Sequence, residues 1–229
     1  MKKMLLSVLA IIILIIVIIT GLIGWTTSTN RRLNASDFAL TKLTSKEIKL
    51  DSNPERIDLS VRTAVVKIQL GKTNTLKLTN VGSNQYHVNQ NDSRLGISEH
   101  SADTHQIEIG HSPQIILTLT KRNLHALKID QLNGTLKLNN LTVQDLQLHH
   151  HNGTTVVRGL TITGSGELTK DNGQTDFYQL TNSGLNVSIK SGQFKLNGIK
   201  KASSGHSYHE FGNHPLTINS GSGQVRISQ

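Results

Sequence analysis

Three consecutive histidines, His149 to His151, are the residues of this chain with the clearest capacity for chemistry. Asp130 precedes His149 by 19 residues, and Asp171 follows His151 by 20 residues. Two imidazoles and two carboxylates form a donor set that can hold a divalent transition metal. The same four side chains could instead be solvated turn residues that form only exposed ion pairs. The sequence alone leaves both interpretations open.

Spacings of 19 and 20 residues are also the period of a repeat that runs from Leu124 to Gln229. The copies follow the pattern Leu-x-apolar-x-x-x-Asn/Ser-Gly-x-x-x-apolar-x-x-apolar, except that Gly166 replaces the leucine of the third copy and the fifth reaches only its first downstream apolar residue, Ile227. The turn pairs are Asn133-Gly134, Asn152-Gly153, Asn172-Gly173, Ser191-Gly192 and Ser222-Gly223. A fixed period of about 20 residues is typical of stacked units, and apolar residues alternate with polar ones as in strands with one buried face. The pattern predicts an all-β fold, a parallel β-solenoid of rungs about 19 to 20 residues long, and this stacking would bring the four candidate metal ligands together.

Recurrence of like residues decides between two arrangements of these strands. An Asn-Gly pair can also close an antiparallel hairpin, so a two-layer meander is the alternative to a stack. Rungs stacked about 4.8 Å apart would place like residues above one another. A meander would not require the same residues to recur at the same positions. We therefore expect the amides of Asn133, Asn152 and Asn172 to hydrogen bond along the stack. We also expect the hydroxyls of Thr155 and Thr175 to pair between adjacent rungs.

One corner of the repeat, Lys200 to Pro215, is longer than its counterparts. Rung pairing fixes the strand lengths, so this extra segment is expected to project as a loop that the stack tolerates. Loops on rigid scaffolds often carry binding residues, although a mobile insertion without a ligand is the alternative. The candidate binding residues in this corner are Lys200, Lys201, His206, Tyr208, His209, Phe211 and His214.

The first 29 residues contain an uncharged apolar run, Met4 to Trp25, which follows two lysines. About 20 apolar residues cross the hydrocarbon layer of a membrane, whereas the apolar region of a signal peptide has about 7 to 15 residues. Residues 1–29 are therefore predicted to be a transmembrane helix that stays as an anchor, with a cleaved signal as the alternative. Basic residues flank the run on both sides, but long domains translocate with little regard to charge. We expect a single-pass cell-membrane protein with most of its chain outside the cytoplasm.

The remainder divides into two segments. Residues 30–46 have few apolar side chains and no periodicity, so they are expected to form a stalk. Residues 47–229 are expected to form one β-domain, with regular rungs from residue 124. The strands before residue 124 are expected to cover the open end of the stack, because five repeats alone would be marginally stable.

Charge indicates which partners to expect. The chain has 24 basic and 15 acidic residues and no cysteine, so no disulfide stabilises it. Without the two lysines before the span, the excess is +7. Anionic wall polymers or phospholipid heads are the partners that such a surface favours, and a basic domain without a specific anion is the alternative. Nucleic acid is not expected, because the few aromatic residues leave little for base stacking.

Catalytic motifs are missing from the sequence. It has no cysteine nucleophile, no Gly-x-Ser-x-Gly elbow and no phosphate-binding Gly-x-x-x-x-Gly-Lys-Ser/Thr loop. Paired carboxylates that cleave glycosides lie about 5 to 9.5 Å apart, and no two acidic residues of the rungs share a position in the repeat. Those residues are Asp130, Asp145, Glu167, Asp171 and Asp176. We expect no catalysis and no cofactor, and an enzyme acting on envelope polysaccharide is the alternative.

A single span, the alternating segment Arg56-Ile-Asp-Leu-Ser-Val, and tandem Leu-x-Ile-x-x-x-Asn-Gly-x-x-x-Leu rungs resemble the bacterial putative-adhesin family. This family is a domain of unknown function, and the resemblance covers nearly everything after residue 46. It implies a β-solenoid surface domain, several members of which are encoded beside envelope-stress signalling systems in Gram-positive bacteria. It therefore implies a membrane-anchored adhesin or cell-envelope binding or sensing module, with an envelope-stress membrane protein as a further possible partner. No catalytic residues are established for the family, so none is carried over.

Overall fold

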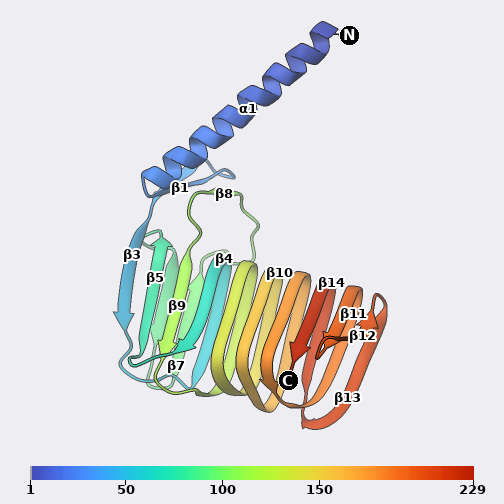
Figure 1. Ribbon diagram of the computed structural model, residues 1–229. Coiled ribbons are helices and arrows are strands. Elements are labelled where there is room, and N and C mark those ends of the chain that lie inside the picture. Colours follow the sequence, from blue (N-terminus) through green and yellow to red (C-terminus); the bar gives the residue numbers. More distant parts are fainter. Residues whose placement is uncertain (1) are drawn as a thin grey trace.

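The computed structural model describes residues 2–229 as one apolar helix followed by a long β-stack (Figure 1). The helix is α1 (Lys2–Ser28). The strands are β1 (Arg31–Asn34), β2 (Ala39–Lys42), β3 (Thr44–Lys49), β4 (Arg56–Leu70), β5 (Thr75–Val81), β6 (Tyr86–Gln90), β7 (Arg94–Glu99), β8 (Glu108–Ile109), β9 (Gln114–Leu119), β10 (Asn123–Thr181), β11 (Ser183–Leu196), β12 (Ile199–Ser203), β13 (His206–His214) and β14 (Leu216–Ser228). The predicted N-terminal helix and mainly β domain are confirmed.

The repeats form rungs that pair in parallel and in register. β10 is continuous through three repeats, and its first rung pairs with β4 while its third pairs with β14. The turn glycines stack as the repeat predicts: a Cβ built on Gly153, at φ +120°, would lie 2.0 Å from the carbonyl oxygen of Gly134. Only glycine allows the rungs to approach so closely at this corner.

The asparagine ladder beside these glycines is confirmed. Asn152 Nδ2 donates to Asn133 Oδ1 at 3.2 Å, and Asn172 Nδ2 donates to Asn152 Oδ1 at 2.9 Å. At the start of the stack Asn133 Nδ2 reaches Thr63 Oγ1 of β4 at 3.5 Å. The amides of Asn133 and Asn152 therefore each donate to one neighbour and accept from the other, which fixes the register of these rungs.

The order of the last two rungs differs from the order of the repeats in the sequence. β14, the C-terminal repeat, lies between the third rung of β10 and β11, and it is parallel to both (Figure 1). Leu168 of β10 and Val187 of β11 both pair with Ile218 of β14. Sequential stacking is therefore wrong at this point. All rungs carry the same apolar positions, so β14 buries its own equally well when it enters between two others.

Both ends of the stack are antiparallel, so the sheet is mixed and a purely parallel stack is not what forms. At the N-terminal end β5 pairs antiparallel with β9, β3 with β5, and β6 with β7. At the other end β12 and β13 both pair antiparallel with β11. A parallel rung leaves an unpaired edge that invites association with other chains, and these strands cover it.

The long corner, residues 200–215, does not project as a loop. It forms most of β12 and all of β13, which lie over the exposed end of β11 (Figure 1). Ala202 is buried, and the Tyr208 ring packs against the core with its centroid 5.5 Å from that of Phe194. The extra residues cover apolar surface and backbone groups that the last rung would otherwise expose, which is why they fold onto the stack.

Residues 30–46, expected to be a stalk, also take part in the fold. β1 pairs with β2 and with β8 in a small separate sheet, and β3 joins the main sheet. Arg32 of β1 is 4% exposed, and its Nη2 donates to the carbonyl oxygen of His111 at 2.9 Å. Its Nη1 donates to Gln85 Oε1 at 3.2 Å. This buried guanidinium joins the segment after the helix to the loops of the stack.

A second buried arginine completes the junction. Arg62 of β4 pairs with Glu108 of β8 at 2.9 Å and with Glu99 of β7 at 3.3 Å. The backbone amide of Arg62 donates to Glu99 Oε2 at 2.8 Å. Charges this deeply buried hold together only when each is paired, so these bonds fix the small sheet to the main one.

Helix α1 packs against almost nothing in the chain. An 18-residue window within its residues 3–28 has a mean hydropathy of 3.3, and the length and composition of the helix suffice for a membrane span or a signal sequence. The side chains of residues 3–25 are exposed apart from Leu22, which is partly buried, and Thr26 is buried at the junction. Such a continuous apolar surface is stable only where something other than water covers it.

Candidate functional site

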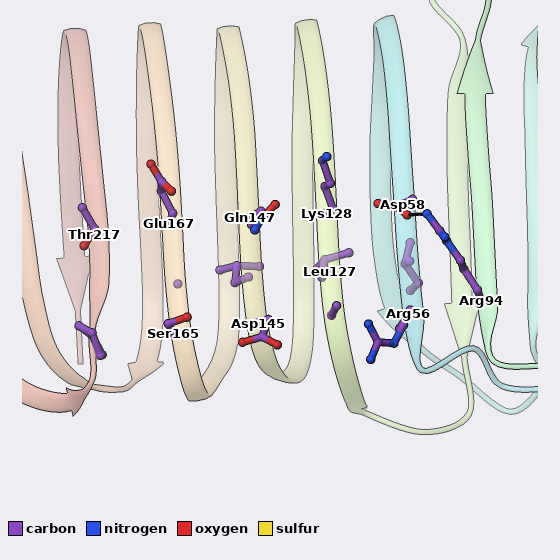
Figure 2. Close-up of a pocket in the computed structure, with 15 residues that line it drawn as sticks. Arg56, Asp58, Arg94, Leu127, Lys128, Asp145, Gln147, Ser165, Glu167 and Thr217 are labelled. Carbon is purple, nitrogen blue, oxygen red and sulfur yellow. Dashed lines mark hydrogen bonds and ion pairs between the residues drawn. The ribbon is translucent and has the colours of Figure 1, made fainter.

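A polar groove of about 660 Å³ crosses the outer face of the stack. It forms because alternate residues of the first strand of each rung point outward, and the register aligns them from rung to rung. Asp58 pairs with Lys128, and Glu167 pairs with Thr217. Figure 2 shows Gln147 between Lys128 and Glu167, so a row of polar side chains from successive rungs lines the groove.

Charge is unevenly distributed along this groove. Arg56, Arg94 and Lys128 gather on the rungs nearest the N-terminal end of the stack, where Arg94 forms an ion pair with Asp58 (Figure 2). Asp145 and Glu167 line it on the following rungs. The groove is therefore cationic at one end and acidic further along, and can bind polar or charged groups on a ligand.

The sequence did not anticipate that Asp145 and Glu167 share one groove. They occupy positions two residues apart in neighbouring repeats. A search for carboxylates at the same position of the repeat therefore does not find them as a pair. Both positions face outward on adjacent rungs, and an alternation pattern read across rungs would have found the pair.

All four residues predicted as metal ligands come together beside this groove. Asp130 carboxylate oxygens lie 3.7 Å from His149 Nδ1 and 3.8 Å from His151 Nε2. His151 Nδ1 is hydrogen bonded to Asp171 Oδ2 at 2.7 Å. The two imidazole rings are 3.9 Å apart between centroids. Asp130 and His149 also line an extension of the groove that contains Lys128 and Glu167.

The histidine between them points the opposite way. His150 is fully buried, and its Nδ1 lies 2.8 Å from Thr155 Oγ1 and 3.0 Å from Lys170 Nζ. Burial, with the charge of Lys170 as a smaller cause, lowers the pKa of His150 to about 3. Burial lowers the pKa of Lys170 to about 8, although the Asp171 carboxylate opposes that shift. The repeat pattern did not predict a lysine inside the stack.

The threonine pair expected between rungs does not form. Thr155 Oγ1 instead bonds the buried imidazole and lies 3.4 Å from Lys170 Nζ. Thr175 Oγ1 has no hydrogen-bond partner among residues 2–229. The Thr155 hydroxyl hydrogen bonds to the buried lysine and histidine, because hydrogen bonds to buried charged or polar groups are stronger than a bond between two hydroxyls.

The seven candidate binding residues of the long corner are spread over β12, β13 and their flanks. All except Tyr208 are exposed, and Phe211 is 89% exposed. His209 is hydrogen bonded to Asn186 of β11, and its ring contacts that of Phe211 edge-on at 4.2 Å. These residues lie at the end of the stack, and none of them lines the groove.

A family model for the Toastrack DUF4097 domain matches residues 54–229. The chain belongs to the Toastrack DUF4097 family. This confirms the resemblance to a putative-adhesin domain family of unknown function that the repeats indicated. The matched region contains all the rungs, the groove and the histidine cluster, whereas α1 and the small sheet strands β1 and β2 precede it. Among curated proteins, none matches the chain.

One solved structure supports the fold of this Toastrack domain. A putative cell adhesion protein from Clostridium sporogenes is 15% identical, with a TM-score of 0.54, over 82% of this chain and 100% of that chain. A putative adhesin from Bacteroides fragilis is 12% identical, with a TM-score of 0.34, over 81% and 97%. A putative lipid binding protein from Parabacteroides distasonis is 12% identical, with a TM-score of 0.32, over 81% and 96%. At these identities the likeness to the first structure establishes the fold alone.

Proposed function

We propose that the chain is a membrane-anchored, extracytoplasmic module that binds or senses the cell envelope without catalysis. One observation carries this proposal: an apolar helix of membrane-spanning length leads directly into strand β1, which a buried arginine network joins to a β-stack with a polar groove. In this proposal the helix stays uncleaved, the repeats are a β-solenoid, and the stack holds the groove at a set position relative to the membrane surface. Gram-positive bacteria are the setting that the resemblance implies.

Anionic wall polymers or phospholipid heads are the partners that the charge favours. The domain outside the membrane carries an excess of +7, and Arg56, Arg94 and Lys128 concentrate positive charge at one end of the groove. An envelope-stress membrane protein is the alternative partner, and we propose no nucleic acid. Attraction between exposed charges weakens as salt increases, because the Debye length shortens from about 10 Å at 0.1 M to about 3 Å at 1 M.

Membrane topology is tested by adding protease to intact cells from which the wall has been removed. We expect digestion of the chain beyond residue 30. If the domain is protected until the cells are lysed, it is cytoplasmic and the proposal fails.

Ligand binding is tested with the full chain in nanodiscs of neutral lipid, mixed with purified phosphate-rich wall polymer or with anionic vesicles. The double variant Arg56→Glu, Arg94→Glu should lose at least tenfold in affinity, with a shallower dependence on salt. The matched control is Lys67→Glu, Lys137→Glu, which makes the same change of charge on two neighbouring rungs outside the groove. Equal losses in both variants would show a general charge effect rather than binding in the groove.

The enzyme alternative has one observation in its favour, since Asp145 and Glu167 line the same groove. Incubation of the full chain with envelope polysaccharide should release no sugar product. Product release that Asp145→Asn or Glu167→Gln abolishes would contradict a purely binding role.

A further inference from the structure

We propose that Asp130, His149 and His151 bind a divalent transition metal of the Zn²⁺ class on the outer face of the stack. This site does not depend on the proposed envelope function. Two imidazoles and one carboxylate supply the nitrogen and oxygen donors that such metals prefer. Magnesium and calcium favour all-oxygen sites instead, so the donor set selects the class of metal.

The distances between the donor atoms support coordination rather than direct hydrogen bonds. Asp130 lies 3.7 Å from His149 Nδ1 and 3.8 Å from His151 Nε2, which is too long for either contact to be a hydrogen bond. Ligand atoms bound to one tetrahedral zinc are about 3.4 Å apart, since each bond is about 2.0 to 2.1 Å. The three donors can all lie within 4.8 Å of one another. Small side-chain rotations would therefore bring them to bonding distance of one ion.

Asp171 positions one of these ligands. Its carboxylate is 2.7 Å from His151 Nδ1, so the neutral imidazole donates its Nδ1 hydrogen to Asp171 and leaves the lone pair of Nε2 facing Asp130. A carboxylate that holds the second nitrogen of a metal-bound histidine is a recurrent feature of metal sites and raises the basicity of the ligand. We assign Asp171 this positioning role rather than direct coordination.

The stack itself prearranges the site. His149 and His151 lie two residues apart on one strand, so both point outward, and the neighbouring rungs supply Asp130 and Asp171. The asparagine ladder and the glycine corner fix the register of these rungs. The side chains of His149 and His151 are 42% and 27% exposed, so an ion can enter from solvent and keep positions open for water or an exogenous ligand.

Calorimetric titration of the full chain in detergent micelles with Zn²⁺ tests the site, and Co²⁺ titration followed by visible absorption gives the coordination geometry. We expect one equivalent of high affinity. His149→Ala and His151→Ala should each weaken binding at least tenfold, and Asp171→Asn should weaken it about 10- to 100-fold. His105→Ala is the control, because it removes an exposed histidine of a loop outside the cluster.

Circular dichroism melting shows whether each variant is folded, and Asp130→Asn provides a further variant that leaves both histidines in place. The proposal is overturned if folded His149→Ala, His151→Ala and Asp130→Asn all bind like the native chain. It is also overturned if binding of the one Zn²⁺ ion is lost only when His206, His209 and His214 are replaced together, or if the native chain binds no Zn²⁺.

Discussion

Lys170 Nζ lies 3.0 Å from His150 Nδ1 inside the stack, and neither side chain forms an ion pair with a carboxylate among residues 2–229. The lysine is 1% exposed. Its hydrogen-bond partners among residues 2–229 are this imidazole and Thr155. Because desolvation penalises the ammonium, burial lowers the pKa of Lys170 from 10.5 to about 8. The buried lysine therefore costs stability at neutral pH.

The pH dependence follows from that shift. Between pH 8 and 10.5 the unfolded chain binds more protons at Lys170 than the folded chain does, so the free energy of unfolding rises with pH across this window. Below pH 8 the full cost of burying the charge is present. Lys170→Met should raise the free energy of unfolding at pH 7 by about 1 to 3 kcal/mol. It should also remove the rise of this free energy between pH 8 and 10.5 that Lys170 causes.

Urea unfolding at pH 7 and pH 10, followed by circular dichroism in micelles, measures both effects. Lys137→Met is the control because Lys137 is exposed at the surface of the stack, and it should change neither value. A Lys170→Met chain that is less stable than the native chain at pH 7 would show that the lysine contributes a net stabilising interaction.

One substitution should have opposite effects at two equivalent positions of the repeat. Thr155→Val removes the hydroxyl that bonds His150 at 2.8 Å, and it should destabilise by about 1 to 3 kcal/mol because the buried Lys170 ammonium loses one of its two hydrogen-bond acceptors among residues 2–229. Thr175→Val replaces a hydroxyl with no partner among residues 2–229, so it should be neutral or stabilising. Thermal melting of the two variants side by side checks the sign, and similar losses in both would contradict the assignment of partners.

Close stacking at the corner predicts a severe effect of Gly153→Ala. The new methyl group would lie 2.0 Å from the carbonyl oxygen of Gly134, so the rungs would have to separate and break their ladder. We expect a loss of more than about 3 kcal/mol in the free energy of unfolding.

Gly205→Ala is the matched control for this effect. Its φ of +74° is also positive, but a Cβ there meets nothing within 4 Å. It should cost only about 1 kcal/mol of backbone strain. Denaturant titration compares the two variants, and equal costs would mean that backbone strain, rather than contact between rungs, dominates at the corner.

The antiparallel cover at the end of the stack should be structural. Tyr208→Ala removes a ring that packs on Phe194, and about 2 to 4 kcal/mol of stability should be lost with it. Phe211→Ala, on the same strand, should be tolerated because that ring is 89% exposed. Replacing residues 201–213 by a short Gly-Ser linker should lower the melting temperature strongly. An unchanged melting temperature after that replacement would show that β12 and β13 contribute nothing to stability.

The sequence by itself determined the unit of the fold. Alternating apolar residues and an Asn-Gly pair at a constant period predict strand, turn and strand, because side chains of a strand alternate between two faces and only glycine fits the tight corner. The same period placed Asp130 beside His149 and His151 beside Asp171, so a cluster separated by about 40 residues could be predicted from spacing alone. Leu138 and Leu148 are buried as the phase of the pattern requires.

Tertiary structure decided the order of the rungs and the conformation of the segments at the two ends of the stack. Every rung offers the same apolar positions and the same backbone edge, so local sequence cannot say which rung lies beside which, and β14 enters between β10 and β11. Residues 30–46 and 200–215 lack the repeat and therefore gave no strand pattern. They become strands because unpaired edges and exposed apolar ends of the stack are costly, a force that exists only once the stack has formed.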